Sequence, residues 1–384
     1  MTKQLVPAEL LKQSNKILFI AHLALGDFTY MQNCFRAFAA AYPHIKMHLW
    51  VDELRRTKDQ TQWEHLKKYV VYDWVTACDM FDKVYTRTYS PDLLAQSIKE
   101  ARSENYPVIV SLATMRRHKY VQLARQINPD GFVVGQKKRV LFYDIPKHII
   151  YRKLDAFIPA YQISHSQRSG AESVRHISRI YADWFHQLFN ISMSEQDSLP
   201  YVDIPKKWIT YALQQFKSWG FDPAEKTVFL NGFSKASHRS WPLSRIVELA
   251  GAIKKIPAWS QTNIIINVVP ESMAEAKAIF ANAHLKQVQL FSAEENFFQL
   301  PAILSLCQLI ISVETAVMHL ANAVHVPVIA LMRQTTPEWT PINAAITTII
   351  KTDSHKGSVE EISINQVLQA LPAPETANIS RVIL

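Results

Sequence analysis

Glycine is scarce in this chain of 384 residues, which contains only 8 copies. Neither a GxGxxG fingerprint nor a GxxxxGK[ST] loop occurs, so the two common glycine-rich phosphate-binding motifs are excluded. Cysteine is equally rare: Cys34, Cys78 and Cys307 lie far apart and form no CxxC pair. This spacing argues against a zinc site or a disulfide framework and fits a reducing cytoplasm. We therefore expect no metal site.

Long apolar runs are also absent. No stretch approaches the roughly 18 residues needed to span a bilayer, and the N-terminal segment lacks the apolar centre of a signal peptide. We expect a soluble or peripheral protein located in the cytoplasm. Lys and Arg number 42 against 33 Asp and Glu, so the net charge of +9 favours an acidic partner. Nucleic acid, an anionic lipid headgroup and a phosphorylated sugar all fit this charge.

The pattern of apolar runs predicts an α/β chain with two domains, since 384 residues exceed what one core usually supports. Short apolar runs of strand type alternate with helical patterns, which favours parallel sheets. These candidate strands are 16–21, 47–51, 108–112, 139–143, 227–230, 263–269, 288–290, 309–313 and 328–331. A polar, proline-bounded segment at 190–205 is typical of a linker. We expect two doubly wound domains, 1–195 and 196–384, that face a central cleft.

The segment from Leu309 to Leu331 is the most informative, because it predicts a strand, a tight polar turn, a short helix and a second strand. Such a turn places the helix N-terminus at the carboxyl edge of the sheet, where unpaired N–H groups attract anions. Glu314 and Thr315 offer side-chain oxygens at this turn, and His319 follows about one helical turn later. The segment therefore predicts a site for a phosphate-bearing ligand.

Several segments of the chain resemble glycosyltransferase family 9, the ADP-heptose:lipopolysaccharide heptosyltransferases of Gram-negative bacteria. The similarity covers most of the chain, in order, through segments 17–27, 229–234, 239–242, 300–304, 312–321 and 326–331. Three positions depart from the family pattern. Glu314 and Ala316 stand where the signature Asp-Thr-Gly-x-x-His has Asp and Gly, and Arg239 replaces the Lys before Trp-Pro. The added methylene of Glu shifts the carboxylate, and the Cβ of Ala can obstruct a pyrophosphate.

The resemblance implies a GT-B fold, with two Rossmann-like domains, and an inverting, metal-independent reaction. Heptose would pass from ADP-heptose, a donor substrate rather than a cofactor, to the Kdo/heptose inner core of lipopolysaccharide or lipooligosaccharide. Asp27 follows Gly26 at a strand-to-helix loop and corresponds to the catalytic base, although capping of the helix is an alternative role.

The donor site implied by the resemblance lies mainly in the second domain, and Gly26 of the first domain is a further expected donor-binding residue. Arg239 can neutralise the β-phosphate, Ser234 can donate a hydroxyl hydrogen bond, and the N–H groups of Thr315, Ala316 and Val317 can complete an anion cradle. Three further donor-site candidates are Glu314 for the sugar hydroxyls, Glu271 for the ribose and His319 for the ligand at large. A plain structural role stays open for all four residues. Arg239 can be a solvated surface charge, and Glu314 an ordinary acid in a turn. Glu271 can be an acid at the start of a helix, and His319 a histidine of the core.

For the acceptor, an anionic lipid A–Kdo-type core, positive charge is available at the sheet ends of the first domain. Arg55 and Arg56 share one loop, and Arg116 and Arg117 follow a predicted strand. The basic run 137–139 can meet phosphates of the inner-membrane surface, so we expect peripheral contact there.

Two other functions remain open on the sequence. The departures at Glu314 and Ala316 fit a family-9-like enzyme that uses another nucleotide sugar or acceptor. A catalytically silent member that binds glycan is a second alternative, but the presence of both Asp27 and Arg239 favours an enzyme. Nucleic-acid binding is disfavoured, because the positive charge is scattered and no binding motif occurs.

Overall fold

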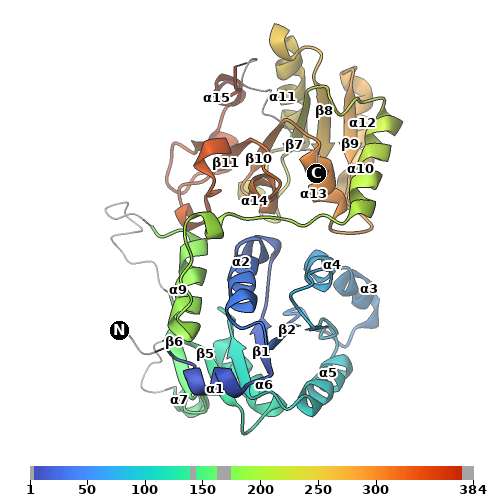
Figure 1. The fold of residues 1–384 in the computed structure, drawn as a ribbon. Coiled ribbons are helices and arrows are strands. Elements are labelled where there is room, and N and C mark those ends of the chain that lie inside the picture. The colour runs from blue at the N-terminus through green and yellow to red at the C-terminus, as the bar shows by residue number, and fades with distance from the viewer. Residues whose placement is uncertain (1–3, 139–143, 162–173, 374–384) are drawn as a thin grey trace. The chain divides into compact units, whose positions relative to one another are not determined.

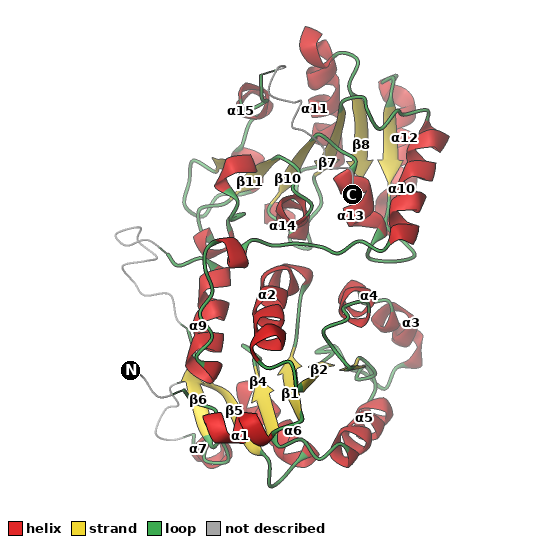
Figure 2. Ribbon diagram, in the orientation of Figure 1, coloured by secondary structure: helices red, strands yellow, loops and turns green. Residues whose placement is uncertain are grey.

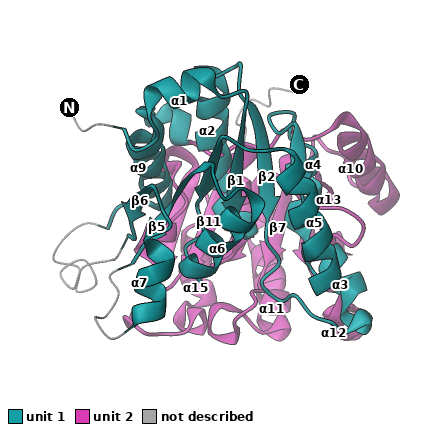
Figure 3. Cartoon of the chain, turned by 90° about the horizontal axis from the view of Figure 1, so that it is seen from below, with its two compact units in different colours: residues 1–198 teal, residues 199–384 magenta. Residues whose placement is uncertain are grey.

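The fold comes from a computed structural model that describes residues 4–138, 144–161 and 174–373. The chain divides into two compact units, residues 1–198 and 199–384, coloured separately in Figure 3. The linker pattern predicts a boundary after residue 195. Each unit contains one six-stranded parallel sheet flanked by helices (Figures 1 and 2).

The sheet of the first unit has the strand order β3-β2-β1-β4-β5-β6. Its strands are β1 (Lys16–Ala21), β2 (Lys46–Val51), β3 (Lys83–Tyr85), β4 (Val108–Ser111), β5 (Phe132–Lys137) and β6 (Ala156–Pro159). Its helices are α1 (Ala8–Gln13), α2 (Leu25–Ala41), α3 (Trp63–Lys67), α4 (Val70–Thr76), α5 (Pro91–Ser103), α6 (Arg117–Ile127), α7 (Ile145–Tyr151) and α9 (Ile177–Phe189). Strand β1 is apolar after its first residue because helices cover both of its faces.

The sheet of the second unit repeats this topology in the order β12-β11-β10-β7-β8-β9. Its strands are β7 (Thr227–Asn231), β8 (Asn263–Asn267), β9 (Val288–Phe291), β10 (Leu309–Val313), β11 (Val328–Met332) and β12 (Thr347–Lys351). Its helices are α10 (Lys206–Trp219), α11 (Leu243–Lys255), α12 (Met273–Ala283), α13 (Gln299–Ser305), α14 (Ala316–Ala323) and α15 (Ile364–Gln369). In a doubly wound sheet the order reverses beside the first strand, here between β7 and β10, and ligands bind at the carboxyl ends there.

The expected α/β class with two doubly wound parallel sheets is confirmed. The predicted strand at 139–143 lies outside the described residues. Strand β4 pairs with β1 on one side and with β5 on the other, and the sequence analysis missed β5 together with β3, β6 and β12. Within the described ranges, no helix combines the length and the apolar character that crossing a membrane requires.

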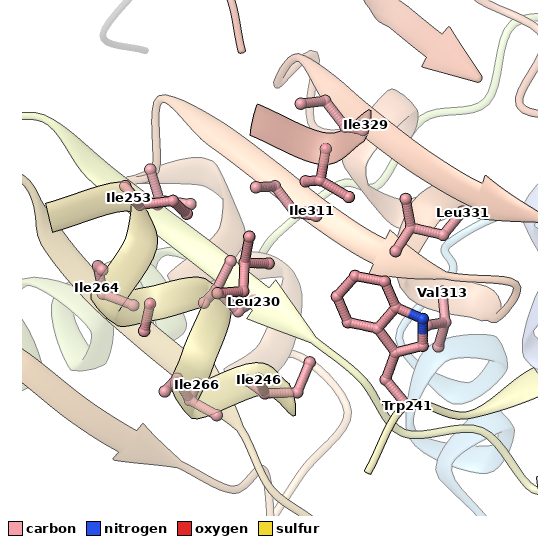
Figure 4. Close-up of a cluster of buried hydrophobic side chains, with 14 of the residues drawn as sticks. Leu230, Trp241, Ile246, Ile253, Ile264, Ile266, Ile311, Val313, Ile329 and Leu331 are labelled. Carbon is pink, nitrogen blue, oxygen red and sulfur yellow. The ribbon is translucent and has the colours of Figure 1, made fainter. Parts of the chain in front are cut away.

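Trp241 anchors the loop that leaves the first strand of the second unit. Its indole lies in the apolar core beside Leu230, Val313 and Leu331 (Figure 4), and the residue is only 2% exposed. Its backbone N–H donates to Gly232 O at 2.9 Å, so the loop closes on itself. The indole Nε1–H donates a hydrogen bond of 2.8 Å to the carbonyl oxygen of the buried residue Val359. This loop carries Arg239 and therefore has fixed ends.

At Gly232 a side chain would crowd the core. A Cβ there would lie 2.5 Å from Cδ1 of Ile246, which belongs to the core beneath helix α11. Side chains in a packed core cannot retreat far without opening voids elsewhere. The close approach of strand β7 to α11 thus depends on the missing side chain at this position.

Candidate active site

Asp27 lies in the first turn of α2, next to Gly26 and directly downstream of strand β1. Its Oδ2 accepts the backbone N–H of Ala24 at 3.0 Å, which is a helix-capping contact. Its Oδ1 accepts the hydroxyl of Tyr181 at 2.6 Å. Tyr181 comes from α9, 154 residues later in the chain, and is 2% exposed. The carboxylate therefore caps its helix and also has a second, long-range partner that the sequence analysis missed.

Burial raises the pKa of Asp27 above its ordinary value of 3.8, and the hydrogen bonds from Tyr181 and Ala24 partly offset this effect. Burial and the nearby charge of Asp27 raise the pKa of the Tyr181 phenol well above 10, so Tyr181 stays a proton donor at neutral pH. A carboxylate with a raised pKa is a better proton acceptor than an exposed one. This suits the general-base role of Asp27, which stays a prediction.

Arg55 and Arg56 follow strand β2, and both are paired with acids that precede them in the sequence. Arg55 donates hydrogen bonds of 2.8 Å from Nε and Nη2 to the two oxygens of the buried Glu53 carboxylate. Arg56 forms an ion pair with Asp52, whose second oxygen accepts the hydroxyl of Tyr120 at 2.9 Å. The charge of both arginines is therefore largely compensated locally, although their acceptor role stays a prediction.

Arg116 and Arg117 lie at the start of α6, beyond the carboxyl end of β4. Their hydrogen bonds go to neutral groups: Arg116 Nη1 donates to Leu54 O at 3.4 Å, and Arg117 Nε donates to Gln136 Oε1 at 3.3 Å. Among the described residues, neither of them forms an ion pair. Of the four predicted acceptor arginines, these two keep an uncompensated positive charge.

His22 follows β1 and was not singled out from the sequence. Its Nε2 is 3.2 Å from the hydroxyl of Thr114, and its ring stacks on Tyr120. Burial, assisted by the charges of Arg117 and Arg116, lowers the pKa of His22 to about 4. The imidazole is therefore neutral at physiological pH and adds no charge to this edge of the sheet.

In the second unit, Asn231 joins the ends of three strands. Its Nδ2 donates to Ser312 Oγ at 3.0 Å and to Thr315 Oγ1 at 3.2 Å, and its Oδ1 accepts Nδ2 of Asn267 at 2.8 Å. Thr315 Oγ1 also accepts the N–H of Val317 at 3.1 Å, so Thr315 is the N-cap of α14. This network fixes the N-terminus of α14, with Ala316 as its first residue, at the point where the strand order reverses.

Glu314, at the same turn, is buried and surrounded by donors. Arg333, which follows β11, donates to it through Nε at 3.2 Å, Nη2 at 3.3 Å and its backbone N–H at 3.3 Å. Thr336 Oγ1 donates to Oε1 at 2.8 Å, and Arg239 Nη1 lies 3.7 Å from the same oxygen. The structure thus brings the predicted residues Arg239 and Glu314 together and adds Arg333 and Thr336. Both additions lie in a polar loop without periodicity, which explains why the sequence did not reveal them.

The other predicted donor residues lie at the same sheet edge but make no direct contact with Glu314 in the described part of the chain. The Ser234 N–H donates to Ser240 Oγ at 3.0 Å within the loop after β7. Glu271 is exposed in the single turn Pro270–Ser272 that follows β8. His319 is 3% exposed, and its ring centre lies 6.0 Å from that of Trp339. The roles of all three stay predictions.

Across residues 4–138, 144–161 and 174–373, no group of three or more His, Cys, Asp and Glu side chains is arranged to hold a metal ion. The metal-independent reaction stays a prediction.

Solved structures share this architecture. The glycosyl transferase family 9 protein of Veillonella parvula aligns with a TM-score of 0.70 at 15% identity, over 94% of this chain and 97% of that chain. Escherichia coli ADP-heptose lps heptosyltransferase II gives a TM-score of 0.63 at 16% identity, over 92% and 96%. E. coli heptosyltransferase WaaC with ADP gives 0.58 at 14% identity, over 92% and 96%. These similarities confirm the fold as that of the GT-B heptosyltransferases.

Sequence comparison gives the family. No curated protein sequence matches the chain. The sequence model of glycosyltransferase family 9 (heptosyltransferase) matches residues 140–368, which is more than half of the chain and includes Arg239, Glu314 and Arg333. The chain therefore belongs to glycosyltransferase family 9 and is a heptosyltransferase-like glycosyltransferase.

Proposed function

We propose that this enzyme transfers heptose from ADP-heptose to the Kdo/heptose inner core of lipopolysaccharide or lipooligosaccharide, with inversion and without a metal ion. The observation that carries the proposal is the cluster of Arg239 and Arg333 around Glu314, next to the N-terminus of α14. The similar E. coli protein WaaC is described with ADP, which supports a nucleoside diphosphate as the ligand here.

The second unit would hold the donor. Two guanidinium groups and one carboxylate leave one net positive charge, and the N–H groups of the first turn of α14 point to the same edge. Negative charge builds up on the diphosphate as its bond to the anomeric carbon breaks. Fixed positive charge at that position stabilises the departing group.

The first unit would activate the acceptor. In one displacement, the acceptor hydroxyl oxygen bonds to the anomeric carbon, its proton passes to Asp27, and the nucleoside diphosphate leaves with the electron pair of the broken C–O bond. Attack from the face opposite the leaving group inverts the anomeric centre. Arg116 and Arg117, whose charges are uncompensated, are the residues of this unit best suited to an anionic acceptor.

A thermal-shift screen tests the donor. We expect ADP and ADP-heptose at 100 times their Kd to stabilise the native protein by about 2.7 kcal/mol, because both would bind only the folded state. UDP, GDP and CDP, with their sugar derivatives, are the matched comparisons. Stabilisation by UDP but not by ADP would reject ADP-heptose as the donor. Binding of ADP-heptose without turnover on any inner-core acceptor would instead indicate a silent glycan-binding member.

Use of another nucleotide sugar remains the second candidate, and one observation favours it. The carboxylate of Glu314 is already occupied by donors from Arg333 and Thr336, so sugar recognition differs here from that implied by the family signature. The screen above separates the two donors.

We further propose that the first unit touches the inner-membrane surface from the cytoplasm. Ile145 and Ile149, four residues apart on α7, are 62% and 53% exposed, and they share one face of the helix. Phe157 on β6 is 45% exposed, with Lys137 Nζ 4.7 Å from its ring centre. Exposed apolar side chains beside basic ones suit an anionic lipid surface. Of the predicted basic run 137–139, Arg139 lies outside the described residues.

Sedimentation with vesicles tests this contact. Vesicles with phosphatidylglycerol should bind the protein, and the double variant Ile145→Ser/Ile149→Ser should bind at least about tenfold more weakly, because each Ile contributes about 1.5–3 kcal/mol when buried. Leu213→Ser, which removes a 45% exposed residue of α10 in the other unit, is the matched control. Equal binding of the double variant and the control would contradict the proposed surface.

A further inference from the structure

We propose that Arg333 is a second diphosphate-binding guanidinium and that Glu314 positions it, instead of binding the donor sugar directly. This inference rests on the proposed function, since it needs a nucleoside diphosphate at this site. It goes beyond that function by assigning a ligand contact to a residue outside the family signature segments.

The carboxylate of Glu314 has no capacity left for a sugar hydroxyl. Oε1 accepts from Thr336 Oγ1 and Arg333 Nη2, and Oε2 accepts from Arg333 Nε and the Arg333 backbone N–H. A carboxylate has about four lone-pair sites, and these four donors occupy them. Glu314 is also only 3% exposed. Its chemistry is therefore that of an anchor within the protein.

The length of the Glu314 side chain explains why it can reach this partner. Residue 314 follows β10 and residue 333 follows β11, and these neighbouring strands are paired in parallel. The hydrogen bonds from Arg333 Nε and Nη2 to the Glu314 carboxylate therefore connect the ends of β10 and β11. An aspartate at 314 would be shorter by one C–C bond, about 1.5 Å. The departure from the family signature at 314 is thus coupled to the arginine at 333.

Arg333 keeps donors available for a ligand after it has bound Glu314. Its Nη1 makes no hydrogen bond to any of the described residues, and the side chain is 14% exposed. Arg239 Nη1 lies 3.7 Å from Glu314 Oε1, the oxygen that also accepts Arg333 Nη2, and the buried Nε of Arg239 lacks a partner within the described ranges. The guanidinium groups of Arg239 and Arg333 thus lie beside one carboxylate. Each is planar and can donate two parallel hydrogen bonds, so together they suit the two linked phosphates of a diphosphate.

Calorimetric titration of Arg333→Gln with inorganic pyrophosphate, ADP and adenosine tests the assignment. We expect the affinities for pyrophosphate and ADP to fall at least about tenfold, since hydrogen bonds to charged groups contribute about 1.5–3 kcal/mol, and the affinity for adenosine to stay unchanged. Arg333→Lys should lose less, because it keeps the charge, and it serves if the Gln variant does not fold. An equal loss for adenosine, or an unchanged pyrophosphate affinity, would overturn the role of Arg333.

Glu314→Gln tests the other half of the inference. The ratio of ADP-heptose affinity to ADP affinity should stay within about twofold of the wild-type ratio if Glu314 only positions Arg333, whereas a selective loss of ADP-heptose binding would make it a sugar ligand. The donor hypothesis fails separately. If wild-type protein binds UDP and pyrophosphate but not ADP, and Arg333→Gln weakens both, then Arg333 keeps its role and only the nucleotide changes.

Discussion

Replacing Asp27 with Asn will lower kcat by about a hundredfold to ten-thousandfold, the range that a positioned general base contributes. Asn keeps the shape of the side chain and can accept the hydrogen bond of Tyr181, but it cannot take a proton. Binding of the nucleotide, which we assign to the other unit, should be unchanged. Release of nucleoside diphosphate in the presence of acceptor measures turnover, and calorimetry measures binding. Full activity of the Asn variant would remove Asp27 as the base.

Tyr181→Phe is the companion variant, and its effect depends on pH. The base acts only when it is deprotonated, so kcat/KM falls as the pH drops through the pKa of Asp27, which burial has raised. The Tyr181 hydrogen bond lowers that pKa, and its loss will raise it further. The acidic limb of the profile should therefore move to higher pH, with the plateau largely retained. A purely structural Tyr181 would lower the plateau and leave the limb in place.

Trp241→Ala should lower the free energy of unfolding by about 3–5 kcal/mol, the usual loss when a buried aromatic is truncated. The variant opens a cavity among Leu230, Val313 and Leu331 and leaves Val359 O without its indole donor. Urea denaturation followed by far-UV circular dichroism measures the change.

Two control variants separate the contributions at Trp241. Trp241→Phe keeps most of the apolar volume and loses the hydrogen bond to Val359 O, so it should be destabilised by less. Trp208→Ala removes a half-buried indole from α10 and should have a smaller effect than Trp241→Ala. Equal losses for Trp208→Ala and Trp241→Ala would show that the 232–241 loop is not anchored by its indole.

The sheets were largely predictable because their strands are short apolar runs with polar ends. Strands β1, β10 and β11 are buried along nearly their whole length, so no alternation disguises them. Strand β5 was missed, since Gly135 interrupts its apolar character and a stronger apolar run follows at 139–143. The sequence analysis also missed β3, β6 and β12. Local hydrophobicity therefore identified the elements, but it could not rank two neighbouring candidates.

The site was predictable where its residues lie in sequence motifs. Arg239 and Glu314 were both proposed for the donor site, and in the structure Arg239 Nη1 lies 3.7 Å from Glu314 Oε1. Tyr181 and Arg333 were not proposed, because each acquires its meaning from a partner that is distant in sequence. A helical period places Tyr181 on the buried face of α9, but no local pattern reveals that Asp27 lies opposite.

The hydrogen bond between Asn231 and Ser312 joins residues 81 positions apart, across the adjacent strands β7 and β10. Contacts of such long sequence separation form late, because the intervening chain loses much of its conformational freedom when they close. Strands β8 and β9 and the helices α11, α12 and α13 lie between these two residues in the sequence. The turn at the N-terminus of α14 is therefore complete only when β7 and β10 are paired within the second unit.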